Sequence, residues 1–175
     1  MHNSLFKRII PKILVSHNAK AGIPQALTTK HFKNFRFIGD PTSQALIFQS
    51  NGADELFLVN IEPKEINHSQ FGSIIGKVNQ KIFMPLTVGG GIRSISDAKE
   101  ILRSGADKVA INTAAVANPT LISEIAKEFG SQCVISSIEA KKIDNSRWEV
   151  YTDNGRERTG LDVVTWSKTC VKNGA

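Results

Sequence analysis

The chain has 175 residues, of which 41% are hydrophobic and 22% charged, and this is the composition of an ordinary globular domain rather than of a disordered segment. Its formal net charge is +6, but the 22 basic residues are scattered without a long cluster, which argues against binding to nucleic acid. The first residues contain neither the apolar run of a signal peptide nor a membrane-spanning stretch, so a cytoplasmic protein without a membrane partner is expected. Cys133, Cys170 and the four histidines lack the spacing of metal ligands, and no metal site is predicted.

The first half of the chain alternates strand-like and helix-like segments. Residues 8–15 form the first predicted strand, and the polar residues 16–38 are expected to be a long loop. Asp40 followed by Pro41 predicts the start of a helix, which ends near residues 51–52. The second strand is then predicted at 55–61, a helix at 71–78, and the third strand at 83–88.

The second half continues this alternation. A helix is predicted at 94–103, and the fourth strand follows at 108–111. Asn118 and Pro119 repeat the signal of a cap followed by proline, so a fourth helix is expected to begin there, before a fifth strand at 132–138. The alternation between 141 and 158 predicts a β-hairpin, and a last helix is predicted at 159–172.

Strands separated by helices predict a parallel sheet with right-handed crossovers, either an open doubly wound sheet or a closed barrel. An internal repeat favours the barrel, because Gly52-Ala53-Asp54 opens the second strand and Gly105-Ala106-Asp107 opens the fourth. The predicted fold class is α/β, a partial (β/α)8 TIM barrel with about five of its eight strand-helix units. Residues 1–175 are expected to form a single incomplete domain of strands one to five and helix five, with a β-hairpin insertion after strand five.

The repeat also predicts a missing continuation. Asn51-Gly52-Ala53 introduces the second strand, and the sequence stops at Asn173-Gly174-Ala175, where another strand is expected. An eight-unit barrel needs about 250 residues. The sequence is therefore interpreted as truncated.

Two of the predicted strands end in residues that suit an anion. Gly90 and Gly91 follow the third strand, and Asn112 and Thr113 follow the fourth. At strand tips of a barrel, glycine amides allow close approach of a phosphate, and the two polar side chains can donate to it. These four residues are the predicted phosphate-binding site for a phosphorylated small-molecule substrate. The alternative is that the glycines only form a tight turn.

With these motifs the chain resembles the cyclase subunit of imidazole glycerol phosphate synthase, a histidine-biosynthesis barrel. The resemblance covers nearly the whole chain and is carried, in order, by Arg8-Ile9-Ile10-Pro11, Gly39-Asp40-Pro41, Asp54-Glu55-Leu56, Val88-Gly89-Gly90-Gly91-Ile92, Gly105-Ala106-Asp107-Lys108-Val109, Ile111-Asn112-Thr113-Ala114-Ala115 and Phe129-Gly130-Ser131-Gln132. It implies a lyase without a cofactor, which takes ammonia from a glutaminase partner in a heterodimer. The ammonia cleaves and cyclises a phosphoribosyl-aminoimidazole nucleotide.

The resemblance also implies catalytic and gating residues. Two aspartates at strand tips carry out acid-base work in the family; here Leu14 stands at the first position and Glu139 at the second. Leucine cannot transfer a proton, so Glu139 is the predicted catalytic residue. Arg8, Glu55 and Lys108 match three of the four charged residues that surround the family's ammonia entrance. Their alternative role is a set of ion pairs that stabilises the base of the barrel.

Leu14 and the segment 32–41 are also similar to a branch of the family that performs acetamidino modification in surface-polysaccharide biosynthesis. Members of that branch are thought to act with a glutaminase and an ATP-dependent sugar amidotransferase. Lys12 and Thr28 depart from its usual cysteine and lysine. The favoured hypothesis is an ammonia-accepting, cyclase-like subunit for acetamidino modification of a nucleotide-sugar. The cyclase of histidine biosynthesis is the alternative, and a catalytically inactive barrel fragment is a second, so whether the chain is an enzyme stays open at the level of sequence.

Overall fold

The computed structural model describes residues 7–18, 23–30, 33–62 and 68–175. Within them the strands are β1 (Lys12–Asn18), β2 (Ile23–Lys30), β3 (Lys33–Gly39), β4 (Leu56–Asn60), β5 (Leu86–Gly89), β6 (Lys108–Ile111), β7 (Val134–Ser136), β8 (Glu139–Lys142), β9 (Trp148–Thr152) and β10 (Glu157–Asp162). The helices are α1 (Pro41–Ser50), α2 (His68–Asn79), α3 (Ile95–Arg103), α4 (Thr113–Ala117), α5 (Thr120–Phe129), the 3-10 turn η1 (Ser131–Cys133) and α6 (Val163–Lys172).

The main sheet of the described residues has the strand order β3-β2-β1-β4-β5-β6-β7. Neighbouring strands from β1 through β4, β5, β6 and β7 are parallel, whereas β2 and β3 form an antiparallel extension. In register, Val59 of β4 faces Gly89 of β5, which in turn faces Ala110 of β6. The α/β fold class is confirmed, and the mostly parallel sheet is consistent with a partial TIM barrel.

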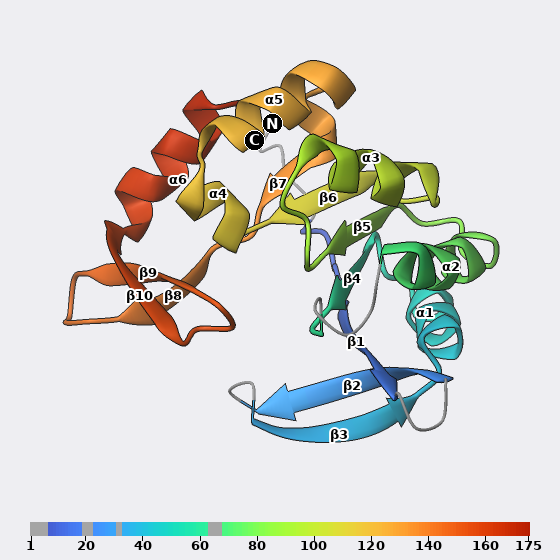
Figure 1. Ribbon diagram of the computed structural model, residues 1–175. Helices are drawn as coiled ribbons and strands as arrows, with labels where there is room; N and C mark the ends of the chain where they lie inside the picture. The colour runs from blue at the N-terminus through green and yellow to red at the C-terminus, as the bar shows by residue number, and fades with distance from the viewer. Residues whose placement is uncertain (1–6, 19–22, 31–32, 63–67) are drawn as a thin grey trace, which may run out of the picture.

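The helices α1, α2, α3 and α5 follow one another along the outer face of this sheet (Figure 1), and each contacts the next. Strand residues at alternate positions, such as Leu56 and Leu58, point to this face and are fully buried. They pack on helix residues such as Phe71, Ile101 and Ile122, which makes the core a single layer between sheet and helices. Of the helices that the structure describes, none has the length and apolar character that crossing a bilayer requires.

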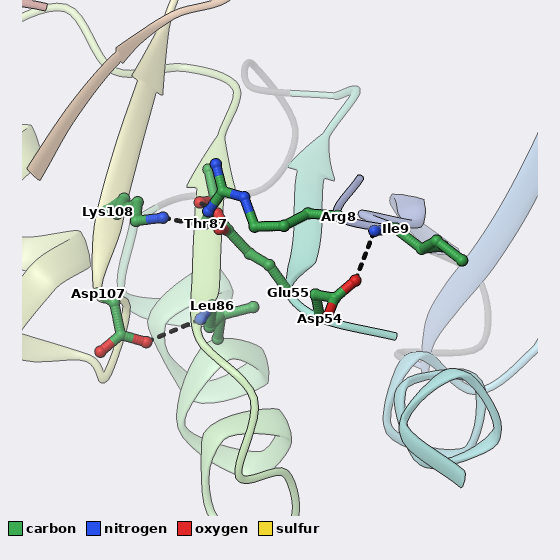
Figure 2. Close-up of polar contacts among 8 residues, drawn as sticks. All are labelled: Arg8, Ile9, Asp54, Glu55, Leu86, Thr87, Asp107 and Lys108. Atoms are coloured by element: carbon green, nitrogen blue, oxygen red, sulfur yellow. Dashed lines mark hydrogen bonds and ion pairs between the residues drawn. The ribbon is translucent and has the colours of Figure 1, made fainter. Parts of the chain in front are cut away.

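The repeated Gly-Ala-Asp motif has the same structural role twice (Figure 2). Asp54 accepts a hydrogen bond from the backbone N–H of Ile9 at 2.6 Å and donates its own N–H to the Ile9 carbonyl at 2.9 Å. Asp107 forms the same pair with Leu86, at 2.7 and 2.8 Å. Each aspartate therefore joins the entrance of its own strand to a neighbouring segment, which is the structural basis of the repeat seen in the sequence.

The prediction of a loop at residues 16–38 was wrong. The structure continues β1 to Asn18 and then forms the antiparallel strands β2 and β3, drawn as the blue hairpin at the foot of Figure 1. Residues 34–38 of β3 are all exposed, because this strand lies at the edge of the sheet. An edge strand without a buried face lacks the alternation of apolar and polar residues from which strands are predicted.

Other boundaries also differ from the prediction. The first strand begins at Lys12 rather than residue 8, and the third at Leu86 rather than residue 83. The predicted hairpin is a three-stranded antiparallel sheet, β8-β9-β10, so the last helix begins at Val163 and not at residue 159. The short helix α4 directly after β6 was not predicted. Exposed apolar residues before β1 and β5 made the predicted strands too long, and the short segments around α4 and β10 gave too weak a periodic signal to place an end.

The N-terminus of α1 offers a test of helix capping. The Asp40 carboxylate accepts hydrogen bonds from the backbone N–H of Ser43 at 2.8 Å and from its hydroxyl at 3.1 Å. We expect Asp40→Ala to lower the free energy of unfolding by about 1 kcal/mol, because the first turn loses an acceptor for a free N–H group. Asp40→Ser, which can still cap, should retain most of the stability in urea denaturation. Equal losses in the two variants would contradict a capping role.

Candidate functional site

A cavity of about 620 Å³ lies at the carboxyl ends of the parallel strands, where barrels of this kind build their sites. Its walls come from β1, β4, β5, β6 and the segment around β8. The predicted site residues Gly90, Gly91, Asn112, Thr113 and Glu139 all line it. Residues that are up to 49 positions apart in the sequence thus meet in one cavity, as strand tips of one sheet should.

The glycines after β5 are required by the backbone. Gly90 and Gly91 have φ values of +93° and +81°, in the region that side chains disfavour. A Cβ atom at Gly90 would lie 2.0 Å from the carbonyl oxygen of Asn60 at the end of β4. The tight turn therefore accounts for glycine at position 90 without a ligand, and phosphate binding at these amides stays a prediction.

Asn112 and Thr113 differ in their surroundings. The Asn112 side chain acts to lower the pKa of the Glu139 carboxyl, while its own Oδ1 atom is buried and has no hydrogen-bond partner among the described residues. Thr113 Oγ1 accepts a long hydrogen bond of 3.4 Å from the backbone N–H of Asp153. The structure thus brings Asn112 and Glu139 to the same cavity, and it leaves the buried amide oxygen of Asn112 without a hydrogen bond.

Glu139 lies at the start of β8 with its carboxylate directed toward the cavity wall formed by the β9–β10 turn. The backbone N–H of Gly155 donates to Glu139 Oε2 at 2.6 Å. Burial raises the pKa of Glu139 above its ordinary value, although the hydrogen bonds from Gly155 and Asn112 and the charge of Lys12 act in the opposite direction. A carboxyl group whose pKa is raised gives up its proton less readily than an ordinary one, which suits a group that transfers protons.

Leu14 and Lys12 occupy the same face of β1, because they are two residues apart. Leu14 is 8% exposed and pairs with Leu27 of β2 and Val59 of β4. Lys12 lines the cavity, and its ammonium group lies 5.0 Å from the centre of the Phe57 ring. Burial lowers the pKa of Lys12, although the charge of Glu139 opposes this. Lys12 was not among the predicted site residues; a lysine within an apolar strand was the signal that could have identified it.

The three predicted gate residues meet at the opposite edge of the sheet, where the strands begin (Figure 2). Glu55 is 3% exposed, and its carboxylate accepts from Lys108 at 2.7 Å, from Thr87 at 2.5 Å and from Arg8 at 3.4 Å. Burial alone would raise the pKa of Glu55, but Lys108, Thr87 and Arg8 outweigh it and hold the pKa below its ordinary value. The sequence did not identify Thr87 as a member of this cluster. This geometry fits a set of ion pairs that stabilises the base of the barrel, and it also fits an ammonia entrance.

The cluster gives a second stability test. We expect Glu55→Gln to lower the free energy of unfolding by about 2 kcal/mol at pH 7, less than a fully buried pair would lose, because Lys108 and Arg8 keep contact with water. A carboxyl whose pKa is depressed by folding stabilises the protein above its unfolded pKa, and that contribution disappears as pH falls through the folded value. The difference in the free energy of unfolding between wild type and Glu55→Gln should therefore shrink below about pH 4. Urea denaturation at pH 7 and pH 3 measures it, with Glu128→Gln on α5 as a control; an unchanged difference at pH 3 would count against the ion pairs.

The chain is similar to known proteins over most of its length. A family model described as "Histidine biosynthesis protein" matches residues 8–175. The relatives include proteins named imidazole glycerol phosphate synthase subunit HisF. The one from Legionella pneumophila is 50% identical over 152 residues, which cover 87% of this chain and 72% of the relative. Those from Myxococcus xanthus and Lactococcus lactis are 41% and 44% identical; the matches cover 94% and 98% of this chain but 64% of each relative. The chain thus spans slightly less than two thirds of the length of these two relatives.

Proposed function

The chain belongs to the histidine biosynthesis protein family, and we propose on this basis that it is the ammonia-accepting cyclase part of an imidazole glycerol phosphate synthase. In this proposal a glutaminase partner supplies ammonia at the edge of the sheet where the strands begin. The nitrogen attacks a phosphoribosyl-aminoimidazole nucleotide that is bound at the opposite edge. Its phosphate is held by the turn after β5 and by the residues that follow β6.

The observation that carries the proposal is the position of Glu139. It is a carboxyl group with a raised pKa in a cavity at the carboxyl ends of the strands, and the glycine turn of Gly90 and Gly91 lines the same cavity. Addition of ammonia followed by ring closure requires protons to be given to and taken from substrate atoms, which such a group can do. The cluster of Arg8, Glu55 and Lys108 at the other edge supports an entrance for a small, neutral nitrogen donor on that side.

The test is a turnover assay with the protein that carries this chain. It is incubated with the phosphoribosyl-aminoimidazole nucleotide and an ammonium salt, and both expected products, imidazole glycerol phosphate and the aminoimidazole carboxamide ribotide, are quantified by mass spectrometry. Formation of both in equal amounts supports the cyclase function. A second assay replaces ammonium by glutamine and a family glutaminase and tests the partner. Substrate binding without either product would overturn the cyclase function.

A second candidate is acetamidino modification of a nucleotide-linked sugar in polysaccharide biosynthesis, and Leu14 favours it. Leu14 stands where the cyclase resemblance implies the first catalytic aspartate, and a side chain of carbon and hydrogen cannot replace it. In this role the chain would deliver ammonia to an ATP-dependent sugar amidotransferase. Neighbouring genes for sugar amidotransferases and glycosyltransferases, with no product in the turnover assay, would support this candidate; neighbouring histidine genes would count against it.

A further inference from the structure

One face of the small sheet β8-β9-β10 carries a series of contacts that ends at Glu139. Glu139 and Lys141 of β8 are two residues apart and so project to the same face of the strand. Tyr151 of β9 is in register with Glu139, and residues directly opposite each other in an antiparallel pair lie on one face. The ammonium group of Lys141 lies 4.3 Å from the centre of the Tyr151 ring. These three side chains therefore share one face of the sheet.

The same ammonium group reaches the turn between β9 and β10. Lys141 Nζ donates a hydrogen bond to the carbonyl oxygen of Gly155. The backbone N–H of Gly155 in turn donates to Glu139 Oε2 at 2.6 Å. The two polar groups of one glycine thus join an exposed lysine to a carboxylate that lines the cavity. A shift of Gly155 would move the donor on which the orientation of this carboxylate depends.

The turn has a backbone that needs support. Asp153, Asn154 and Gly155 have φ values of +50°, +57° and +71°. Side chains disfavour this region, and aspartate and asparagine tolerate it best. At the first of these residues, the Arg156 side chain donates to the Asp153 carboxylate at 2.8 Å and to its carbonyl oxygen at 2.9 Å. At the third, the side chain of Lys141 holds the Gly155 carbonyl.

We propose that Lys141 is a positioning residue for Glu139, on which it acts through Gly155; this rests on the cyclase function proposed above, in which Glu139 transfers protons. Lys141 is not one of the residues that line the cavity, so it does not touch the substrate. It holds the turn so that the Gly155 N–H stays directed at Glu139 Oε2. Placement of the carboxyl group matters, because a displacement of about 1 Å can cost about a hundredfold in rate.

The neighbouring charges argue against a simple ion pair as the role of this lysine. Glu149 of β9 is opposite Lys141 in register and is the carboxylate with which a cross-strand ion pair would form. The Glu149 carboxylate instead accepts from Arg158 at 2.8 Å and from the N–H of Gly160 at 2.9 Å. The ammonium group of Lys141 therefore lies at the turn, where it meets a carbonyl oxygen and an aromatic ring.

The electrostatics of Glu139 make the contact measurable. Burial raises the pKa of Glu139, and the charge of Asp153 in the turn adds to this rise. The Gly155 hydrogen bond, the charge of Lys12 on β1 and the Asn112 side chain act in the opposite direction. A hydrogen bond from an N–H group favours the charged carboxylate. Release of the Gly155 N–H should therefore raise the pKa of Glu139 further.

The experiment compares Lys141→Met and Lys141→Arg with Lys142→Met, the next lysine of β8, which is also exposed, in the protein that carries this chain. In ammonium-dependent turnover, kcat should fall about tenfold in Lys141→Met, because Glu139 is displaced but keeps its chemistry. The limb of the pH profile that reports the Glu139 titration should move to higher pH. Lys141→Arg can still donate to the carbonyl and lie over the ring, so its limb should stay in place. Lys142→Met should stay within about twofold of wild type. An unmoved limb in Lys141→Met would overturn the proposal.

A second measurement does not depend on turnover. The amide resonance of Gly155 is followed against pH by NMR, since the shift of an N–H bonded to a carboxylate changes when the carboxylate takes up a proton. In wild type this resonance should follow the Glu139 titration, and Glu139→Gln should abolish the change. In Lys141→Met most of the change should be lost. Equal changes in wild type and Lys141→Met would overturn the positioning role. Loss of the change in Lys141→Met, together with absence of turnover in wild type, would overturn the cyclase function alone.

Discussion

Replacement of Glu139 by glutamine is expected to lower kcat with ammonium by about 10²- to 10⁴-fold, the range over which a general acid or base contributes. The amide has the shape of the carboxyl group and can still accept the Gly155 N–H, but it cannot give or take a proton. Because burial raises the pKa of Glu139, the limb of the wild-type pH profile that reports its titration should lie at higher pH than an ordinary carboxyl would give. This limb should be absent from the residual activity of the variant.

The controls separate chemistry from folding. Glu128→Gln removes an exposed carboxylate from α5 and should leave kcat within about twofold and the unfolding midpoint unchanged. Glu139→Asp keeps a carboxylic acid but withdraws it by about 1 Å, so it should lose activity, by roughly a hundredfold, and still show a limb from a titrating carboxyl group. An unchanged kcat in Glu139→Gln would remove this residue from the mechanism.

The second large effect is structural. Gly90→Ala should lower the free energy of unfolding by about 3 kcal/mol, since it combines two costs. An alanine at the φ of +93° is disfavoured by about 1–2 kcal/mol, and the new Cβ would lie 2.0 Å from the Asn60 carbonyl oxygen, which forces the ends of β4 and β5 apart at a further cost of about 1–3 kcal/mol. Urea denaturation measures the total.

A matched control isolates the steric part. Gly52 has a φ of +81°, but no heavy atom lies within 4 Å of a Cβ built there. Gly52→Ala should therefore lose only about 1 kcal/mol from backbone strain. Equal losses at positions 52 and 90 would show that the turn after β5 can relax away from Asn60, and the close approach would then not explain the glycine.

Strands are predicted most accurately from the sequence where they are buried and their apolar residues follow a regular pattern. β6 was predicted with its observed bounds, Lys108–Ile111, and the strand tips of β5 and β6 brought the predicted site residues into one cavity. The hairpin of β2 and β3 could not be predicted in this way, because β3 is exposed along 34–38 and has no buried face to impose a period of two. Backbone pairing with β1, which extends the sheet, is invisible in the sequence pattern.

The site was predictable in position but incomplete in its members. Motif resemblance identified Glu139 and the cluster around Glu55, whereas Lys12 and Thr87 were found only in the structure. Both missing residues act through spatial neighbours that are distant in sequence: Lys12 is paired in charge with Glu139, and Thr87 donates to Glu55. Local patterns contain no information on such contacts, because these depend on the register between strands.

The contacts made by the two aspartates of the Gly-Ala-Asp repeat close loops of different length. Asp54 reaches Ile9 across 45 residues, whereas Asp107 reaches Leu86 across 21. The entropy of closing the shorter loop is smaller by about 0.7 kcal/mol, so the contact between Asp107 and Leu86 forms roughly three times more readily in an unfolded chain. Folding should consequently nucleate around β5 and β6. Asp107→Ala is then expected chiefly to slow refolding, and Asp54→Ala chiefly to speed unfolding, in stopped-flow kinetics. Chemically equivalent contacts would thus act at different times on the folding pathway.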